Sequence, residues 1–171
     1  SLGCKGWRLD VADELPEEFI ENLRNTARNK NKEAVIIGEV WEDASNKISY
    51  GKRRRYLYGG LLDSVTNYPL REAIIEYILG NTPAEEICAS IMCLYENYPK
   101  EAFYSMLNMI GGHDVPRILS VLAGSGADNY NEADAGLMDL AVKRLKLAVL
   151  IQMTLPGSPS IYYGDEAGAM G

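Results

Sequence analysis

The sequence predicts an α/β protein in which parallel strands alternate with helices. Short apolar segments recur along the 171 residues, and longer segments with apolar residues at helical spacing lie between them. Residues 34–40, A-V-I-I-G-E-V, are almost continuously apolar, as expected for a strand buried on both faces of a parallel sheet. This alternation implies right-handed crossovers in a sheet that is either open and doubly wound or part of a closed barrel.

The predicted elements follow one another in a regular order. The segments with strand character are 7–11, 34–40, 61–65, 103–109 and 160–163. The segments with helical spacing are 16–30, 69–79, 83–98, 115–123 and 135–155. The first helix is expected to begin at Pro16 with two glutamates in its first turn, and the last to end before Pro156. Residues 42–59 and 124–134 are expected to be loops.

The charge of the chain argues against a nucleic-acid partner. The formal net charge is −7, whereas proteins that bind a phosphate backbone carry a basic surface. The dense basic run at residues 52–55 is expected to be a solvated loop. No glycine-rich phosphate loop follows the first strand, which counts against a nucleotide-binding sheet.

The cysteines argue against a disulfide-stabilised protein, and the hydropathy argues against a membrane-spanning one. Three cysteines imply no disulfide framework, and Cys88 and Cys93 are expected to fill the core of an apolar helix. No apolar run reaches the roughly 18 residues that a membrane span needs, and no charged-then-apolar leader opens the chain. We therefore expect a cytoplasmic protein with no membrane partner.

An arginine and an aspartate stand in the first predicted strand. Alternation along the strand puts Arg8 and Asp10 on one face and Trp7 and Leu9 on the other. Arg8 then lies one layer below Asp10, where it holds that carboxylate ionised and oriented, as a nucleophile requires. The alternative is an ion pair that only ties the strand end to its loop.

A second carboxylate ends the next predicted strand. Glu39 follows Asp10 by 29 positions, about one β-α unit, so both carboxylates are expected at the same end of neighbouring parallel strands. Apolar neighbours and a nearby negative charge favour the protonated carboxyl, which suits a general acid. The alternative is a lone carboxylate in a loop.

A third strand end carries the only histidine of the chain. His113 and Asp114 lie in N-M-I-G-G-H-D-V-P-R, and without a second histidine or a suitable cysteine pair they provide no zinc site. Two carboxylates about 5 to 5.5 Å apart that flank an anomeric carbon make a retaining glycosidase. A third acid and a histidine donor would hold the sugar hydroxyls as positive charge develops.

These motifs resemble the alpha-amylase family of glycoside hydrolases. G-W-R-L-D-V-A-D-E, I-I-G-E-V-W and N-M-I-G-G-H-D resemble its second, third and fourth signature regions, and P-G-S-P-S-I-Y-Y-G-D-E resembles the end of its eighth barrel strand. Within the family the chain is most similar to the neopullulanase, cyclomaltodextrinase and maltogenic amylase group. The resemblance implies that Asp10 is the nucleophile, Glu39 the acid/base and Asp114 the transition-state stabiliser.

The resemblance also implies substrate-binding residues. Arg8 would orient Asp10, and His113 would contact the sugar in the same subsite. Trp41 would offer a stacking face on the leaving-group side, with a core aromatic as the alternative. Candidates for the cleft wall are Glu14 and Tyr68, the latter with helix-start packing as its alternative.

The chain departs from the family pattern at a few positions. Asp13 stands where asparagine is usual, and Gly112 and Val115 replace the common serine and threonine. These departures leave the chemistry intact and leave the substrate open. The first signature region has no counterpart here, so that the resemblance implies only about strands four to eight of a TIM (β/α)8 barrel, without the last helix and the C-terminal β domain.

These expectations concern a part of a longer enzyme. We expect the 171-residue chain alone to be inactive and to self-associate through open barrel edges. The implied activity is retaining hydrolysis of α-1,4 or α-1,6 glucans such as maltodextrin, cyclodextrin or pullulan. The alternatives are a glucanotransferase or isomerase of the same family, or a non-catalytic carbohydrate-binding or structural member. No organic cofactor is implied, and the calcium ligands usual in the family lie largely outside this segment.

Overall fold

The elements alternate as the sequence predicts, and the chain has the expected α/β class with parallel strands. The computed structural model describes residues 3–124 and 135–171, so most of the predicted loop at 124–134 lies outside the described residues. The strands are β1 (Gly6–Leu9), β2 (Val35–Gly38), β3 (Ile48–Ser49), β4 (Lys52–Arg53), β5 (Ser64–Val65), β6 (Leu107–Met109) and β7 (Ser158–Ser160). The helices are α1 (Glu17–Lys30), α2 (Tyr68–Leu79), α3 (Ala84–Asn97), α4 (Lys100–Tyr104), α5 (Ile118–Ala123) and α6 (Ala135–Thr154), with short 3-10 turns η1 (Ala12–Glu14) and η3 (Asp165–Ala167).

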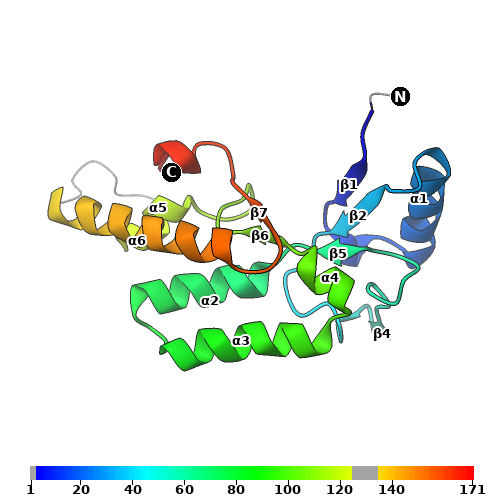
Figure 1. Ribbon diagram of the computed structural model, residues 1–171, viewed down its shortest axis with the longest axis horizontal. Helices are drawn as coiled ribbons and strands as arrows, with labels where there is room; N and C mark the ends of the chain where they lie inside the picture. The colour runs from blue at the N-terminus through cyan, green and yellow to red at the C-terminus, as the bar shows by residue number, and fades with distance from the viewer. Residues whose placement is uncertain (1–2, 125–134) are drawn as a thin grey trace. The chain divides into compact units, whose positions relative to one another are not determined.

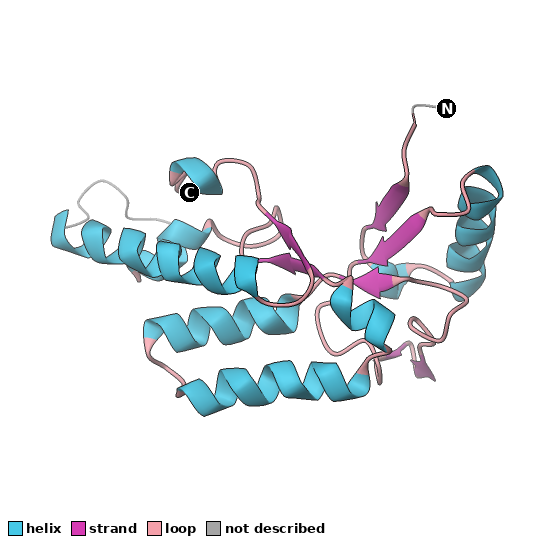
Figure 2. Cartoon of the chain, viewed as in Figure 1, coloured by secondary structure: helices cyan, strands magenta, loops and turns pink. Residues whose placement is uncertain are grey.

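The first of two compact units contains the parallel sheet. It comprises Ser1–Pro69, Ile91–Leu107 and Pro156–Ser158, and its strands lie in the order β1-β2-β5 (Figures 1 and 2). Trp7 pairs with Ile36 and Arg8 with Ile37 across β1 and β2. Side chains of paired residues point to the same face, and Ile36 is fully buried in one core cluster with Ile20 of α1. The Arg8 face is thus the face turned away from α1.

The second unit is mainly helical. It comprises Leu70–Ser90, Asn108–Leu155 and Pro159–Gly171, and α5 packs against α6. The buried Gln152 of α6 donates from its amide to the carbonyl oxygens of Asn108 and Ser160, at 3.0 and 2.8 Å. These two bonds tie the middle of β6 to the end of β7, so a single polar side chain satisfies two backbone acceptors in this core.

Three predicted strands differ from the observed ones. The segment predicted as a strand at 103–109 begins inside α4, because Phe103 is buried as part of a helical turn, and only β6 is extended. The predicted strand at 61–65 contracts to β5, since Leu61 and Leu62 pack into the core from a turn. The strand predicted at 160–163 lies instead at β7, before the tyrosines.

The predicted polar loop at 42–59 is more ordered than expected. It contains the antiparallel hairpin β3-β4, and Arg54, expected in a solvated run, is buried because its guanidinium reaches backbone carbonyls and a tyrosine hydroxyl. The expected core positions of Cys88 and Cys93 are wrong, since both thiols are exposed on α3. The buried face of α3 is supplied by Ile87 and Leu94 instead.

No helix within residues 3–124 and 135–171 is long and apolar enough to cross a membrane. The cytoplasmic location stays a prediction.

Candidate active site

Asp10 and Glu39 come directly after the carboxyl ends of neighbouring strands. β1 ends at Leu9 and β2 at Gly38, and these two residues are partners across the parallel pair. Arg8 joins the two carboxylates, because its Nη1 pairs with Asp10 Oδ1 while its Nη2 lies 2.9 Å from Glu39 Oε1. The two acids therefore lie together in the first unit, as predicted. Arg8 forms ion pairs with both of them, and not with Asp10 alone.

The two acids differ strongly in exposure. The Glu39 side chain is 2% exposed, whereas that of Asp10 is 58% exposed. A buried carboxylate is costly unless a cation and hydrogen-bond donors compensate it. Glu39 thus depends on its neighbours far more than Asp10 does.

Hydrogen-bond donors reach both carboxylate oxygens of Glu39. Oε2 accepts from the backbone N–H of Val11 at 2.8 Å, and Oε1 accepts from the Tyr68 hydroxyl at 3.1 Å in addition to Arg8. The backbone N–H of Ala12 donates to the Glu39 carbonyl at 3.1 Å. Val11 has φ 45°, in the left-handed region that β-branched residues rarely adopt. The loop after β1 therefore contributes directly to holding the Glu39 side chain.

Two aromatic side chains adjoin Glu39. Trp41 stacks on Tyr68 with ring centroids 4.4 Å apart and an interplanar angle of 10°. Trp41 is 49% exposed whereas Tyr68 is buried, so the core alternative for Trp41 does not hold. The indole keeps an accessible face, and Tyr68 supports it from behind while its hydroxyl reaches Glu39.

Glu14 has a different environment from Glu39. It lies in η1 and accepts a hydrogen bond from the Tyr50 hydroxyl beside the β3-β4 hairpin. Both side chains are exposed. The structure thus places Glu14 in the loop that follows Asp10, in contact with the hairpin.

His113 and Asp114 belong to the second unit. His113 Nε2 lies 3.0 Å from Asp114 Oδ2, and both side chains are exposed in the loop after β6. Gly111 begins this loop against the buried Asp165, where a Cβ would lie 2.0 Å from Asp165 Oδ2. Burial raises the pKa of Asp165, and Arg117 opposes this effect from 3.5 Å. A side chain at position 111 would therefore displace the Asp165 carboxylate from its present position.

Sequence reasoning missed a buried polar cluster beside the candidate site. Arg54, Tyr56 and Asp13 form a chain of hydrogen bonds, with Arg54 Nε 2.9 Å from the Tyr56 hydroxyl and that hydroxyl 2.6 Å from Asp13 Oδ1. Three consecutive arginines give no sign of which one is buried. The available signal was the aromatic and apolar pair Tyr56-Leu57 directly after them, which is atypical of a solvated loop.

Comparisons with known proteins agree with these motifs. The profile of the family described as alpha amylase, catalytic domain, matches residues 1–171. The chain is 42% identical over 182 residues to an amylopullulanase of Thermoanaerobacter thermohydrosulfuricus, covering 100% of this chain and 12% of that protein. It is 37% identical over 170 residues to neopullulanase 2 of Thermoactinomyces vulgaris, covering 99% of this chain and 25% of that protein.

A solved structure shows the same fold. A cyclomaltodextrinase matches with a TM-score of 0.78 and 33% sequence identity, over 98% of this chain and 24% of that one. The chain thus spans a quarter or less of the relatives it matches here. Because the family profile covers its whole length, the chain belongs to the alpha-amylase family and forms part of that family's catalytic domain.

Proposed function

We propose that the full-length protein that carries this chain is a retaining glycoside hydrolase acting on α-glucans. The observation that carries this proposal is the pair of carboxylates at adjacent strand ends bridged by the Arg8 guanidinium. A single guanidinium spans only a short gap, which favours the separation of about 5 to 5.5 Å of retaining enzymes over the wider gap of inverting ones.

The two acids have different proposed roles in a double displacement. Asp10, the exposed acid, attacks the anomeric carbon and forms the covalent glycosyl-enzyme, while Glu39 protonates the leaving oxygen. Glu39 then takes a proton from the water that hydrolyses the intermediate. Arg8 keeps Asp10 ionised and oriented, and the N–H of Val11 and the hydroxyl of Tyr68 orient Glu39.

The remaining residues are proposed to bind the sugar. Asp114 and His113 hold hydroxyl groups as the oxocarbenium-like charge develops. The exposed face of Trp41 stacks on a sugar ring on the leaving-group side. Glu14 and Tyr68 contribute to the cleft wall.

The proposed fold is a (β/α)8 barrel of which this chain forms about strands four to eight. The match to a quarter of a cyclomaltodextrinase supports this assignment, as does the position of Asp10 and Glu39 at carboxyl strand ends, where such barrels carry their active sites. The barrel's first three strands, its last helix and the C-terminal β domain are proposed to lie elsewhere in the full-length protein.

The names of the relatives support the substrate class. Amylopullulanase and neopullulanase name pullulan as a substrate, and cyclomaltodextrinase names cyclomaltodextrin. A related cyclic α-maltosyl-(1→6)-maltose hydrolase of Arthrobacter globiformis has been solved in complex with maltose. We therefore propose α-1,4 and α-1,6 linked glucans as substrates, with no organic cofactor.

Product stereochemistry tests the proposed mechanism. The full-length protein is incubated with maltodextrin, cyclodextrin and pullulan in turn, and proton NMR follows the anomeric signals before mutarotation. We expect the α-anomer to form first, because two inversions at the anomeric carbon retain its configuration. Initial formation of the β-anomer would exclude Asp10 as a nucleophile, and no release of sugar from any of the three would overturn the proposed activity.

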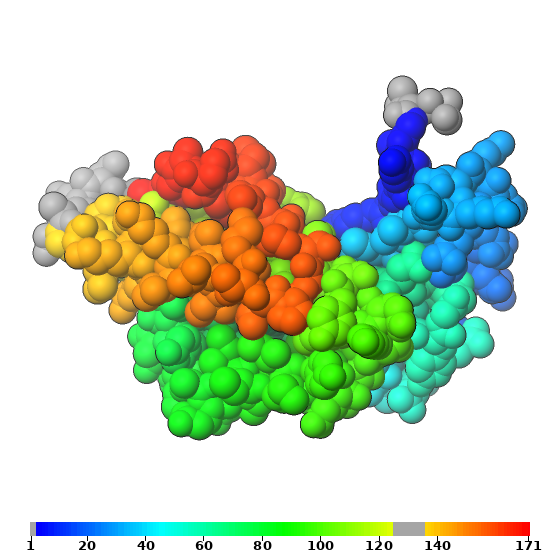
Figure 3. Space-filling view, in the orientation of Figure 1, coloured from blue at the N-terminus to red at the C-terminus, as the bar shows by residue number. Residues whose placement is uncertain are grey.

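The isolated 171-residue chain is proposed to self-associate and to lack activity. Among the described residues β1 pairs only with β2, and an apolar groove beside it is lined by Trp7, Phe19 and Leu23. Figure 3 shows the dark blue segment that leads into this strand projecting from the rest of its unit. An unpaired strand edge beside exposed apolar side chains favours pairing with another chain. Sedimentation velocity at increasing concentration is expected to show dimers or larger species, and a monomer throughout would contradict this expectation.

A further inference from the structure

We infer that Arg54 is a positioning residue of the proposed active site, acting through the loop that follows β1. This inference rests on the proposed function. Arg54 does not reach Asp10 or Glu39 itself. It holds the loop so that Val11 keeps the backbone conformation in which its N–H points at the Glu39 carboxylate.

Arg54 binds the loop after β1 through hydrogen bonds to backbone carbonyls. Arg54 is buried, and its Nη2 donates to the carbonyl oxygens of Ala12, at 3.1 Å, and Leu15. Its Nε donates to the Tyr56 hydroxyl at 2.9 Å, and that hydroxyl donates to Asp13 Oδ1 at 2.6 Å. Burial and the Asp13 carboxylate raise the pKa of Tyr56, so its hydroxyl keeps the proton that it donates. Arg54 and Tyr56 together bind three groups of one turn, the carbonyls of Ala12 and Leu15 and the carboxylate of Asp13.

The hairpin side of this contact is reinforced by further charges. Lys47 Nζ lies 3.1 Å from Asp13 Oδ2, and the Ser49 hydroxyl donates to the Asp13 carbonyl at 3.1 Å. Arg55 forms three hydrogen bonds to Glu17, two from its guanidinium at 3.0 and 2.9 Å and one from its backbone N–H at 2.8 Å. An asparagine at position 13 would lack the negative charge that pairs with Lys47. The Asp13 carboxylate is thus held by Lys47 and Tyr56, on either side of the β3-β4 hairpin.

The loop needs this support because Val11 is strained. A β-branched residue at φ 45° is strained and persists only where the surrounding structure holds it. Its N–H lies 2.8 Å from Glu39 Oε2, and the next residue, the fully buried Ala12, is the first that Arg54 binds. Release of Ala12 would let Val11 relax to negative φ, and the accompanying rotation of the Asp10–Val11 peptide plane would turn the Val11 N–H away from Glu39. Glu39 would then be poorly oriented for proton transfer, and kcat would fall.

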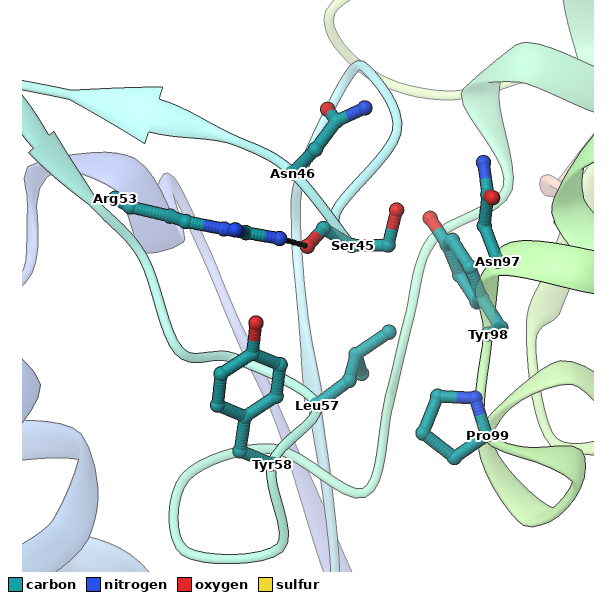
Figure 4. A pocket seen from close by; sticks show the side chains of 8 residues that line it. All are labelled: Ser45, Asn46, Arg53, Leu57, Tyr58, Asn97, Tyr98 and Pro99. Atoms are coloured by element: carbon teal, nitrogen blue, oxygen red, sulfur yellow. Dashed lines mark hydrogen bonds between the residues drawn. The ribbon is translucent and has the colours of Figure 1, made fainter.

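The neighbouring Arg53 provides a matched control. It is exposed and points to the other side of the segment, into a cavity of about 390 Å³ lined by Ser45, Leu57 and Tyr58 among others (Figure 4). Its Nη2 donates to the Ser45 carbonyl at 3.3 Å. Arg53→Gln removes the same charge at the adjacent position without touching the loop after β1.

The experiment compares Arg54→Gln, Tyr56→Phe and Arg53→Gln in the full-length protein on maltodextrin. We expect Arg54→Gln to lower kcat by about 10- to 100-fold with KM changed less than about threefold, because small misplacements of a reacting group cost up to about 100-fold. Tyr56→Phe keeps the ring in its buried site and is expected to lower kcat by about three- to tenfold, since it removes only the hydroxyl. Arg53→Gln is expected to match the wild type.

A second substitution separates positioning from general loss of stability. Glycine adopts positive φ without strain, so Val11→Gly in the Arg54→Gln background is expected to recover at least about fivefold in kcat. Val11→Gly alone is expected to lower kcat slightly. The same substitution therefore lowers kcat in the wild type and raises it in Arg54→Gln, which is the mark of two coupled positions. A general loss of stability in Arg54→Gln would lower the melting temperature but would not be repaired by glycine at position 11.

Different outcomes refute the positioning role of Arg54 and the proposed hydrolase activity. The inference is overturned if Arg54→Gln keeps the kcat of Arg53→Gln, or if Val11→Gly restores none of the loss. If Arg54→Gln does not fold, an unchanged kcat in Tyr56→Phe overturns the inference instead. An inactive wild type together with an inactive Arg53→Gln would refute the proposed function, and with it the basis of this inference.

Discussion

Glu39→Gln and Asp10→Asn are each expected to lower kcat on maltodextrin by about 10³-fold or more in the full-length protein. Glutamine fills the same buried space as Glu39 but cannot deliver a proton to the leaving oxygen. Asparagine at position 10 keeps a contact to Arg8 but is a poor nucleophile. Neither substitution changes side-chain volume appreciably, so we expect circular dichroism spectra close to that of the wild type. The melting temperature of Glu39→Gln is expected to fall, because the buried ion pair with Arg8 is lost.

A substrate with an activated leaving group distinguishes the two roles. A leaving group that departs without protonation needs no general acid in the first step. Glu39→Gln is therefore expected to form the glycosyl-enzyme from an α-maltosyl fluoride at near wild-type rate, detected as a burst of fluoride. Asp10→Asn is expected to show no burst on the same substrate. The reverse pattern would exchange the two assignments.

Glu33→Gln serves as the control for both variants. Glu33 is exposed and precedes β2, at the opposite end of the strand from Glu39. The same chemical change there is expected to leave kcat within about twofold, since surface substitutions away from a site have small effects. Near-normal turnover in Glu39→Gln or Asp10→Asn would refute the role assigned to that residue.

Arg8→Met is expected to have the next largest effect, a fall in kcat/KM on the order of 10²- to 10³-fold. Removing one partner of a buried ion pair destabilises a fold by roughly 3–5 kcal/mol, and the partial exposure of Arg8 makes that loss of stability smaller here. The fall in kcat/KM is a separate effect on the two acids. This fall arises because Glu39 is left buried without its cation and Asp10 loses the group that orients it. Steady-state kinetics on maltodextrin measures the change, and we expect most of it in kcat.

Two further variants test whether geometry or charge is responsible. Arg8→Lys retains the charge, but its compact ammonium lacks the planar fork that lets one arginine bind two carboxylates. We expect it to recover only part of the loss. Arg28→Met removes an ion pair to Asp63 that Arg24 also makes at 2.8 Å, and it is expected to leave kinetics unchanged. Equal activity of Arg8→Met and Arg28→Met would show that Arg8 has no part in the site.

The regular elements were predictable where local pattern and packing agree. Helices α1, α2, α3 and α6 lie within two residues of their predicted bounds, because their apolar spacing matches the face that packs. The strand predicted at 103–109 is wrong at its start, where α4 lies, because an apolar run has the same pattern in a strand and in a buried helical turn. Phe103 is buried in either case, and only tertiary packing decides between them.

In the candidate site, too, some features were predictable from the sequence and others were not. Asp10 and Glu39 were paired from their spacing alone, since a β-α unit brings its successive strand ends together. The donors to Glu39 were not predictable, because the backbone N–H of Val11 and the hydroxyl of Tyr68 reach it from distant positions in the chain. The spacing of residues along the chain predicts which strand ends lie together, but it does not predict which hydrogen-bond donors contact the carboxylates there.

The sequence by itself determined the α/β class, the family, and the two carboxylates expected to carry the chemistry, because each of these depends on residue type at local spacing. The tertiary structure alone decided that Arg8 bridges both acids, that Glu39 is the buried one, and that Arg54 leaves the solvated run to hold the loop after β1. The reason is that burial and hydrogen bonding between segments about 30 to 40 residues apart depend on how the chain packs, which no local pattern records.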